Sequence, residues 1–137
     1  MASSAGDLAP LRILLAEDNA VNQLLAVRRL SKDGHQVLVA ADGEEALAIF
    51  QREPVDLILM DIQMPKMDGF QAAKAIRRLE RSSGGQVPII ALTAHALEGF
   101  RQEALDAGMN EFVTKPIRFA ELRRAMSAVL VGRRTPQ

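Results

Sequence analysis

Short apolar runs separated by longer amphipathic segments constrain the fold of this chain more than any other feature of its sequence. The runs are Leu11–Ala16, Gln36–Ala40, Asp56–Met60, Pro88–Leu92 and the brief Glu111–Val113. Some, such as Leu57–Met60, are continuously apolar, which is typical of strands buried on both faces. Strands of this kind belong to parallel sheets, in which crossover helices cover both sides.

The segments between the runs have the spacing of helices. Near the C-terminus, apolar residues recur at i, i+3, i+4, i+7 and i+8, which indicates a stripe that faces a core. The expected core-facing residues are Val21, Leu25, Ala26 and Leu30; Ala46, Leu47 and Phe50; Phe70, Ala73 and Ile76; and Leu122, Ala125, Met126, Val129 and Leu130. A further helix closes near Gly108. Five strands that alternate with five helices predict an α/β fold with a covered parallel sheet.

Length and composition agree with one globular domain. The chain has 137 residues, 48% of them apolar and 25% charged, and its formal net charge is zero. A zero net charge disfavours binding to nucleic acid or to anionic membranes. The absence of cysteine excludes disulfides and thiolate chemistry. Because no apolar run approaches the roughly 20 residues of a spanning helix, we expect a cytoplasmic domain over residues 11–131, between flexible segments 1–10 and 132–137.

Polar residues follow four of the predicted strands at the point where each strand ends. Glu17 and Asp18 follow the first strand, Asp61 the third, Thr93 the fourth and Lys115 the fifth. Each of these residues alone is typical of a helix cap or a solvated loop. The carboxyl ends of parallel strands share one edge of the sheet, so together they predict three carboxylates, a hydroxyl and an ammonium in one place.

The chemistry of that group favours phosphoryl transfer. Three crowded carboxylates need a counter-ion, and oxygen ligands without cysteine or an adjacent histidine favour Mg²⁺ over Zn²⁺. A lysine and a threonine opposite the cation would bind the remaining phosphoryl oxygens. Asp61, the most deeply set carboxylate, would then attack phosphorus and carry an aspartyl phosphate.

Four separated stretches of the sequence resemble the receiver domain of two-component response regulators. They are Glu17–Asn19, Leu57–Gly69, Ile89–Ala94 and Phe112–Pro116, and they occur in the order typical of the family. The likeness extends over residues 11–131. Two stretches, Asn19–Gln23 and Thr93–Ala96, look most like receivers attached to hybrid sensor histidine kinases. The resemblance implies a flavodoxin-like, doubly wound (βα)5 fold, with a five-stranded parallel sheet in the order 2-1-3-4-5.

The resemblance also implies a role for each matching residue of the acidic group. Asp61 would be the phosphoacceptor. Mg²⁺, or Mn²⁺, would be held by Asp18, by Asp61, by the backbone carbonyl of Gln63 and, through water, by Glu17. Lys115 would pair with the phosphoryl group.

A conformational switch is implied at two further positions. Thr93 would bond a phosphoryl oxygen, and Phe112 would turn inward as Thr93 moves. Tyrosine is common in the family where Phe112 stands, and phenylalanine lacks the hydroxyl, so we expect a less sharply two-state switch. The Lys115–Pro116 peptide bond is expected to be cis. Gln63 and His95 would border the site and tune the lifetime of the phosphoryl group, although a solvent-facing loop position explains His95 equally well.

The implied partner is a sensor histidine kinase or a histidine phosphotransfer domain. Leu24 and Val27 lie beside the apolar face of the first helix and are candidate docking residues, although burial under a neighbouring helix would explain them as well. We expect this domain to be a monomer or weak dimer that contacts neither nucleic acid nor membrane, even where its parent protein is membrane-anchored.

Three other polar residues are not assigned to a site. His35 lies in a polar turn and is expected to be structural or exposed. Arg77 belongs to one of four arginine pairs that we expect to be solvated. Asn110 stands where an acid is frequent in the family, and this difference is expected to matter little.

The function that we expect is that of a phosphoacceptor in a phosphorelay, in the C-terminal receiver of a hybrid sensor histidine kinase. Such a domain is not a conventional enzyme, because it catalyses only its own phosphorylation and dephosphorylation. The alternatives are a stand-alone single-domain regulator, a phosphorylation-independent binding module, a phosphohydrolase and a flavodoxin-like cofactor binder. Gln63 disfavours the phosphohydrolase, which typically has an acid/base aspartate there. The absence of Trp and Tyr disfavours a flavin site.

Overall fold

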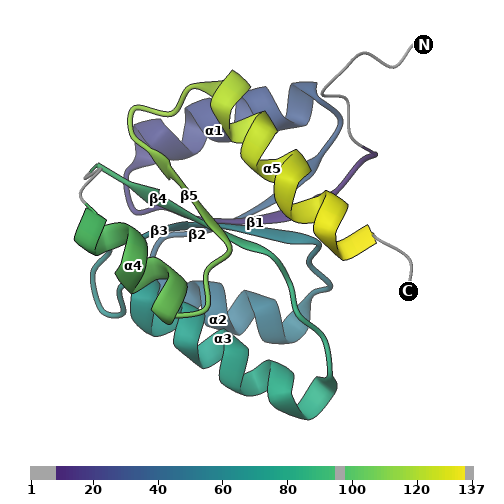
Figure 1. Cartoon of the computed structure of the whole chain (residues 1–137). Coiled ribbons are helices and arrows are strands. Elements are labelled where there is room, and N and C mark those ends of the chain that lie inside the picture. The colour runs from purple at the N-terminus through teal and green to yellow at the C-terminus, as the bar shows by residue number, and fades with distance from the viewer. Residues whose placement is uncertain (1–8, 95–97, 135–137) are drawn as a thin grey trace.

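A computed structural model describes residues 9–94 and 98–134 of the chain (Figure 1). Its elements, in chain order, are β1 (Arg12–Ala16), α1 (Ala20–Lys32), β2 (Gln36–Ala40), α2 (Gly43–Arg52), β3 (Leu57–Asp61), α3 (Gly69–Ser83), β4 (Ile89–Thr93), α4 (Glu98–Asp106), β5 (Glu111–Thr114) and α5 (Phe119–Arg134). The predicted alternation is confirmed, and each strand boundary lies within one residue of its predicted place. Helix α5 continues past residue 131, where the sequence suggested a boundary.

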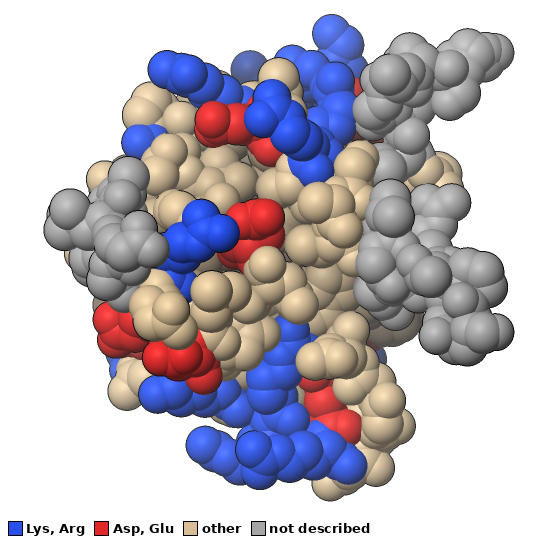
Figure 2. Space-filling model, in the orientation of Figure 1, with Lys and Arg blue, Asp and Glu red and all other residues tan. Residues whose placement is uncertain are grey.

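The strands form one parallel sheet in the order β2-β1-β3-β4-β5, which confirms the flavodoxin-like topology. Helices α2, α3 and α4 cover one face of the sheet, and α1 and α5 cover the other (Figure 1). Basic and acidic side chains are interspersed on the face of the molecule seen in Figure 2. None of the helices in the described part of the chain is long and apolar enough to cross a membrane.

The sheet separates two apolar layers, and this explains the continuous apolar runs. Every residue of β3 and β4 is buried. Because successive side chains of a strand point to opposite faces, Ile58 and Met60 of β3 pack under α2 and α3, whereas Leu57 and Leu59 pack under α1 and α5. A strand covered on both sides therefore has no position for a polar side chain until it reaches the edge of the sheet.

The orientation of α1 differs from the sequence prediction. Val21 and Leu25, which were expected to face the core, are 64% and 55% exposed. Ala26 and Leu30 are buried as expected, and Val27 is half-buried and packs beside them. Apolar residues lie almost all around this helix, so periodicity alone selects no single stripe. The packing of α1 against the sheet selects the stripe that contains Ala26 and Leu30.

Arg77 is not solvated, contrary to the prediction, and Asn110 has a structural role. Arg77 Nη1 lies 2.6 Å from Glu80 Oε1, and its Nε donates to the carbonyl oxygen of Gly108 at 2.9 Å. Arg77 Nη2 also donates to Asn110 Oδ1 at 2.9 Å, an atom that accepts the backbone N–H of Ile89 at 2.8 Å. These bonds join α3 to the start of β4 and to the loop before β5.

His35 is structural, as predicted. It is buried, and its Nδ1 accepts the backbone N–H of Leu11 at 3.1 Å. Burial lowers the pKa of His35, against a smaller opposing effect of Asp33. The acceptor role at Nδ1 requires a ring nitrogen without a proton, so the neutral imidazole is the form that ties the chain before β1 to the turn before β2.

Candidate functional site

The polar residues singled out in the sequence lie at the carboxyl edge of the sheet. Glu17 follows β1 directly, Asp61 is the last residue of β3, Thr93 is the last residue of β4, and Lys115 follows β5 directly. The paired strands end together, with Asp61 opposite Leu92 and Thr93 opposite Thr114. The parallel topology therefore brings side chains that are far apart in the sequence to one end of the sheet.

A lysine stands between two buried carboxylates in this group. Lys115 Nζ lies 2.7 Å from Asp61 Oδ2 and 3.0 Å from Glu17 Oε1. Asp18 completes an acidic cluster, because one carboxylate oxygen from each of Glu17, Asp18 and Asp61 lies within 4.8 Å of the others. Glu17 and Asp61 are buried and Asp18 is exposed. One ammonium faces three carboxylates, so the ionised site has an excess of negative charge.

The start of α1 holds Glu17 in place. Glu17 Oε2 accepts the backbone N–H of Asn19 at 3.1 Å and the side-chain amide of Asn22 at 3.4 Å. The side-chain amide of Gln23 donates to the backbone carbonyl of Glu17 at 2.6 Å. The sequence alone does not assign a role to Asn22 or Gln23 in this support. Their polar side chains in the first turn after the acidic pair were the available signal.

The other carboxylate oxygen of Glu17 is poorly satisfied. Oε1 is buried and accepts no hydrogen bond of good geometry from the described residues, although Lys115 Nζ lies within ion-pair distance. Leaving a buried acceptor without a well-aligned hydrogen-bond donor costs free energy. Three oxygen donors, one of them exposed and one incompletely paired, are suited to a hard divalent cation such as Mg²⁺.

Burial and charge perturb both Asp61 and Lys115. Burial raises the pKa of Asp61, and the charge of Glu17 adds to this effect, whereas Lys115 and the N–H of Gln63 oppose it. Burial would lower the pKa of Lys115, but its ion pairs with Asp61 and Glu17 outweigh that effect and raise it. Lys115 therefore remains an ammonium at neutral pH and supplies a permanent positive charge beside Asp61.

The loop after β3 is pinned close to Asp61. The backbone N–H of Gln63 donates to Asp61 Oδ1 at 3.1 Å. Gly69 donates its N–H to the carbonyl of Ile62 at 2.8 Å, and a Cβ at Gly69 would collide with the backbone of Asp61 and Ile62. Asp68 caps α3 in a capping box, which fixes where the loop ends. The backbone around Gln63 is thus held beside the Asp61 carboxylate, and the Gln63 side chain is exposed.

Thr93 and Phe112 lie on one face of the sheet. Phe112 is opposite Ala91 in the β4–β5 ladder, and Thr93 is two residues beyond Ala91. Residues two apart share a face of a strand, so Thr93 and Phe112 are diagonal neighbours. Thr93 is buried and Phe112 is half-buried. The Lys115–Pro116 peptide bond is cis. His95 lies outside the described residues.

The chain is similar to known proteins over most of its length. Residues 13–127 match the family model of the response regulator receiver domain. The chain is 43% identical over 119 residues to hybrid signal transduction histidine kinase I of Dictyostelium discoideum, covering 83% of the chain and 7% of that protein. It is 42% identical over 116 residues to sensor histidine kinase GacS of Pseudomonas protegens, covering 84% of the chain and 13% of that protein. The chain thus spans a small fraction of the length of these relatives.

Solved structures share the fold closely. The receiver domain of sensor histidine kinase PA1611 from Pseudomonas aeruginosa is 44% identical to this chain, with a TM-score of 0.78. The alignment covers 88% of this chain and 97% of that one. A magnesium ion is coordinated in its active site cleft. A second match is a chain in the complex of the Saccharomyces cerevisiae histidine phosphotransfer protein Ypd1 with the receiver domain of Ssk1. That chain is 32% identical, with a TM-score of 0.82, and the alignment covers 86% of this chain and 87% of that one.

Proposed function

Because this chain belongs to the response regulator receiver domain family of two-component signalling, we propose that it accepts a phosphoryl group onto Asp61 in a Mg²⁺-dependent reaction. The observation that carries the proposal is the acidic cluster around Lys115. Glu17, Asp18 and Asp61 offer oxygens within 4.8 Å of one another, with Lys115 Nζ 2.7 Å from the proposed acceptor. This arrangement supplies a nucleophile, a cation site and a positive charge in one place.

The proposed cation ligands are Asp18, Asp61, the backbone carbonyl of Gln63 and, through water, Glu17. Their all-oxygen chemistry supports this assignment, as does the incompletely paired Glu17 Oε1. The magnesium ion in the PA1611 receiver domain supports it as well. When bound, Mg²⁺ neutralises negative charge on the phosphoryl oxygens and on the crowded carboxylates.

The proposed donor is a phosphohistidine on a partner protein. A carboxylate oxygen of Asp61 attacks phosphorus, the phosphorus–nitrogen bond breaks, and its electron pair returns to the imidazole nitrogen. The product is an acyl phosphate on Asp61. Lys115, held as an ammonium, pairs with one phosphoryl oxygen, and the hydroxyl of Thr93 donates to another. Attack by water on this acyl phosphate later releases inorganic phosphate and restores the carboxylate.

The proposed response to phosphorylation runs from Thr93 to Phe112. A hydroxyl drawn toward the phosphoryl group leaves space on the face that Thr93 shares with Phe112. The ring of Phe112, half-buried on the neighbouring strand, turns inward to fill that space, because protein interiors are closely packed. The phosphoryl group thereby biases an equilibrium between two packings, and the face formed by α4, β5 and α5 reports which is populated.

We propose that the partner docks on α1, next to the site. Val21, Leu24 and Leu25 are 64%, 50% and 55% exposed, so α1 presents an apolar surface to solvent. Leu25 also lines a pocket with Lys115 and Pro116, which connects that surface to the site. The proposed occupant is the helical bundle of a sensor histidine kinase or a histidine phosphotransfer domain, and the Ypd1–Ssk1 complex supports this class of partner. Val27, which the sequence suggested as a second contact, is half-buried and packs against the apolar layer under α1 and α5.

We further propose that residues 11–131 form the C-terminal receiver of a hybrid sensor histidine kinase and act in the cytoplasm. The support is the identity of 42–43% to hybrid and sensor histidine kinases that are many times longer than this chain. In such a protein the donor histidine lies in the same polypeptide or in a separate phosphotransfer domain.

Intact mass spectrometry tests the phosphoacceptor role. The protein is incubated with acetyl phosphate or phosphoramidate, in Mg²⁺ or in EDTA. One phosphoryl adduct that requires Mg²⁺ is expected in the wild type and in Asp68→Asn, and none in Asp61→Asn. Asp68 is a matched control because it is a nearby carboxylate that caps α3, a role that asparagine also fills.

Two results would overturn this proposal. An adduct in Asp61→Asn equal to that of the wild type would remove Asp61 from its role, and an adduct that persists in EDTA would remove the Mg²⁺ requirement. If the wild type forms no adduct with small donors, NMR titration with Mg²⁺ and beryllofluoride decides the question. Unperturbed resonances of Thr93 and Phe112 would then contradict the phosphorylation-dependent switch.

A further inference from the structure

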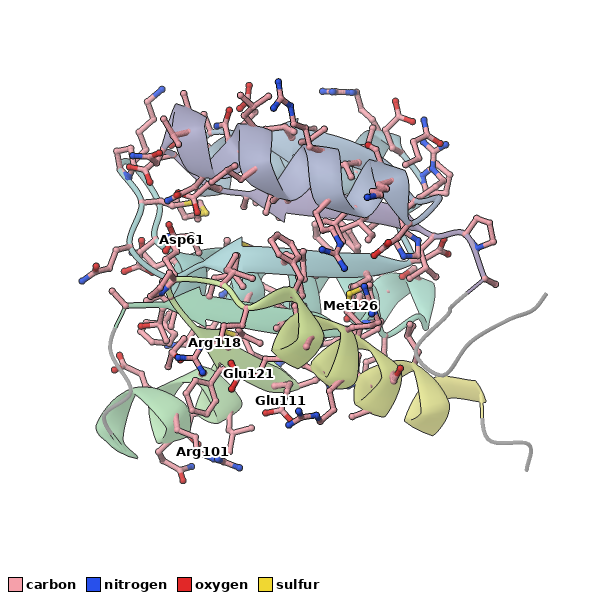
Figure 3. The ribbon with its side chains drawn as sticks, turned by 90° about the horizontal axis from the view of Figure 1, so that it is seen from above. Asp61, Arg101, Glu111, Arg118, Glu121 and Met126 are labelled. Carbon is pink, nitrogen blue, oxygen red and sulfur yellow. The ribbon has the colours of Figure 1, made fainter. Side chains whose placement is uncertain are left out.

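A contact between α4 and β5 is not used by the proposed phosphoryl transfer. The guanidinium carbon of Arg101 lies 5.5 Å from the centroid of the Phe112 ring. This distance is within the range of a cation–π interaction. Arg101 and Phe112 line one pocket of about 340 Å³ together with Glu111, Glu121 and Arg124. In Figure 3, Arg101, Glu111 and Glu121 come from α4, β5 and α5 and lie on the same side of the molecule.

Phe112 is held on two sides by different forces. Its ring packs against the apolar layer under α2, α3 and α4, and the guanidinium of Arg101 covers it from α4. Phenylalanine has no hydroxyl, so no side-chain hydrogen bond can fix the ring at the surface. The contact with Arg101 supplies an attraction specific to this position of the ring, which would be lost if the ring moved away from α4.

We propose that Arg101 is a positioning residue, which holds the ring of Phe112 at the α4–β5 surface and thereby opposes the switched conformation of the domain. The inference rests on the proposed function, because it concerns the coupling of Phe112 to phosphorylation at Asp61. A ligand at Asp61 that favours the inward ring must break the contact with Arg101. Removing Arg101 therefore shifts the equilibrium toward the inward ring before any ligand binds, and the ligand then binds more tightly.

The size of the effect follows from the exposure of the pair. Arg101 is exposed and Phe112 is half-buried. Cation–π contacts at such sites alter an equilibrium about two- to fivefold. We expect Arg101→Gln to raise the affinity for beryllofluoride, in the presence of Mg²⁺, by about this factor. Arg101→Lys keeps a cation but loses the planar guanidinium, so its affinity is expected between those of the wild type and Arg101→Gln.

NMR titration of the full chain with Mg²⁺ and beryllofluoride tests this role, with the ring resonances of Phe112 as the second readout. Arg101→Gln is expected to move those resonances toward their ligand-bound positions before ligand is added. Arg124→Gln is the matched control, because it removes a positive charge from the same pocket and leaves the Arg101–Phe112 contact intact. We expect this control to bind beryllofluoride with the affinity of the wild type.

A double-mutant cycle separates positioning from a general structural effect. In a Phe112→Leu background there is no ring for Arg101 to hold, so Arg101→Gln is expected to have no further effect on affinity. Unchanged or weaker beryllofluoride binding by Arg101→Gln alone would overturn this inference, as would an equal effect with and without the ring. If the wild type binds no beryllofluoride at all, the proposed function fails as well, and the two failures are thereby distinguished.

Discussion

Replacing Lys115 with methionine removes the positive charge between the two buried carboxylates of the site. Methionine keeps an unbranched apolar stem, so the change acts mainly on charge. Lys115 Nζ lies 2.7 Å from Asp61 and 3.0 Å from Glu17, whose side chains are 5% and 1% exposed. The substitution therefore leaves two carboxylates in the interior without their shared counter-ion. We expect Lys115→Met to lower the free energy of unfolding at neutral pH.

The expected loss of stability is about 3 kcal/mol. Removing one partner of a buried ion pair costs about 3–5 kcal/mol, because the remaining charge is left uncompensated. The side chain of Lys115 is 20% exposed, so water reaches part of the vacated space and places the cost at the low end of that range. A domain of this size typically has about 5–15 kcal/mol of stability, so the variant is expected to remain folded.

The loss should depend on pH in a defined direction. Burial raises the pKa of Asp61, and Lys115 opposes that rise. Without Lys115, the pKa of Asp61 in the folded state moves further above its unfolded value of 3.8. A carboxyl with a raised folded pKa favours folding when it is protonated, so the penalty is present at neutral pH and is relieved as the pH falls through the folded pKa.

Urea unfolding in EDTA at a series of pH values measures this loss. Lys66→Met is the control, because Lys66 Nζ lies 3.7 Å from Asp42 and its side chain is 64% exposed, so it should lose less than about 1 kcal/mol. Adding Mg²⁺ should stabilise Lys115→Met more than the wild type, since a bound cation replaces the missing charge. Lys115 is not the counter-ion of these carboxylates if Lys115→Met is as stable as the wild type at pH 7, or if its loss of stability stays constant on acidification.

Three further substitutions test other parts of the structure. Because burial lowers the pKa of His35, the wild type should lose stability as the pH falls below 6.5, the value of that pKa in the unfolded chain. In urea unfolding, His35→Gln should lose less stability over the same pH interval. An equal loss in both proteins would contradict the role of His35 as a buried, neutral acceptor of the Leu11 N–H. Gly69→Ala should lower stability by about 2 kcal/mol in thermal denaturation, because the new Cβ would collide with the backbone of Asp61 and Ile62. An unchanged melting temperature would contradict that collision. Glu80→Gln should lower the free energy of unfolding in urea by about 2 kcal/mol, because it weakens the bonds that Glu80 accepts from Arg77 and from the N–H of Val87, each 2.6 Å long. A change below about 0.5 kcal/mol would show that the charge of Glu80 contributes little.

The strands and their alternation with helices could be predicted because their signals are local. A run such as Leu57–Met60 has no polar position, and only burial on both faces accounts for that pattern. The strand order could not be predicted from the residues alone, which indicate only a parallel sheet. The resemblance to receiver domains supplied the order. The stripe that α1 buries could not be predicted, because exposed Val21 and Leu25 have the same apolar character as buried Leu30.

The candidate site shows the same division between local and long-range information. Asp61 and Lys115 could be placed together because each ends or follows a strand of one parallel sheet. The hydrogen bonds that Asn22 and Gln23 donate to Glu17 depend on side-chain orientations, which the spacing of residues in the sequence does not determine. The contact of Arg101 with Phe112 depends on how α4 lies against β5, which is a property of the packed structure.

Reductive trapping identifies which aspartate carries the phosphoryl group. Borohydride reduces an acyl phosphate to an alcohol, so the aspartate that carried the phosphoryl group becomes homoserine and can be located by peptide sequencing in a mass spectrometer. After incubation with Mg²⁺ and acetyl phosphate, or with a phosphorylated histidine donor, we predict homoserine at position 61 and aspartate at positions 18 and 68. Homoserine at Asp18, or a phosphorylated protein in which residue 61 is still aspartate after reduction, would contradict the assignment of Asp61 as the phosphoacceptor.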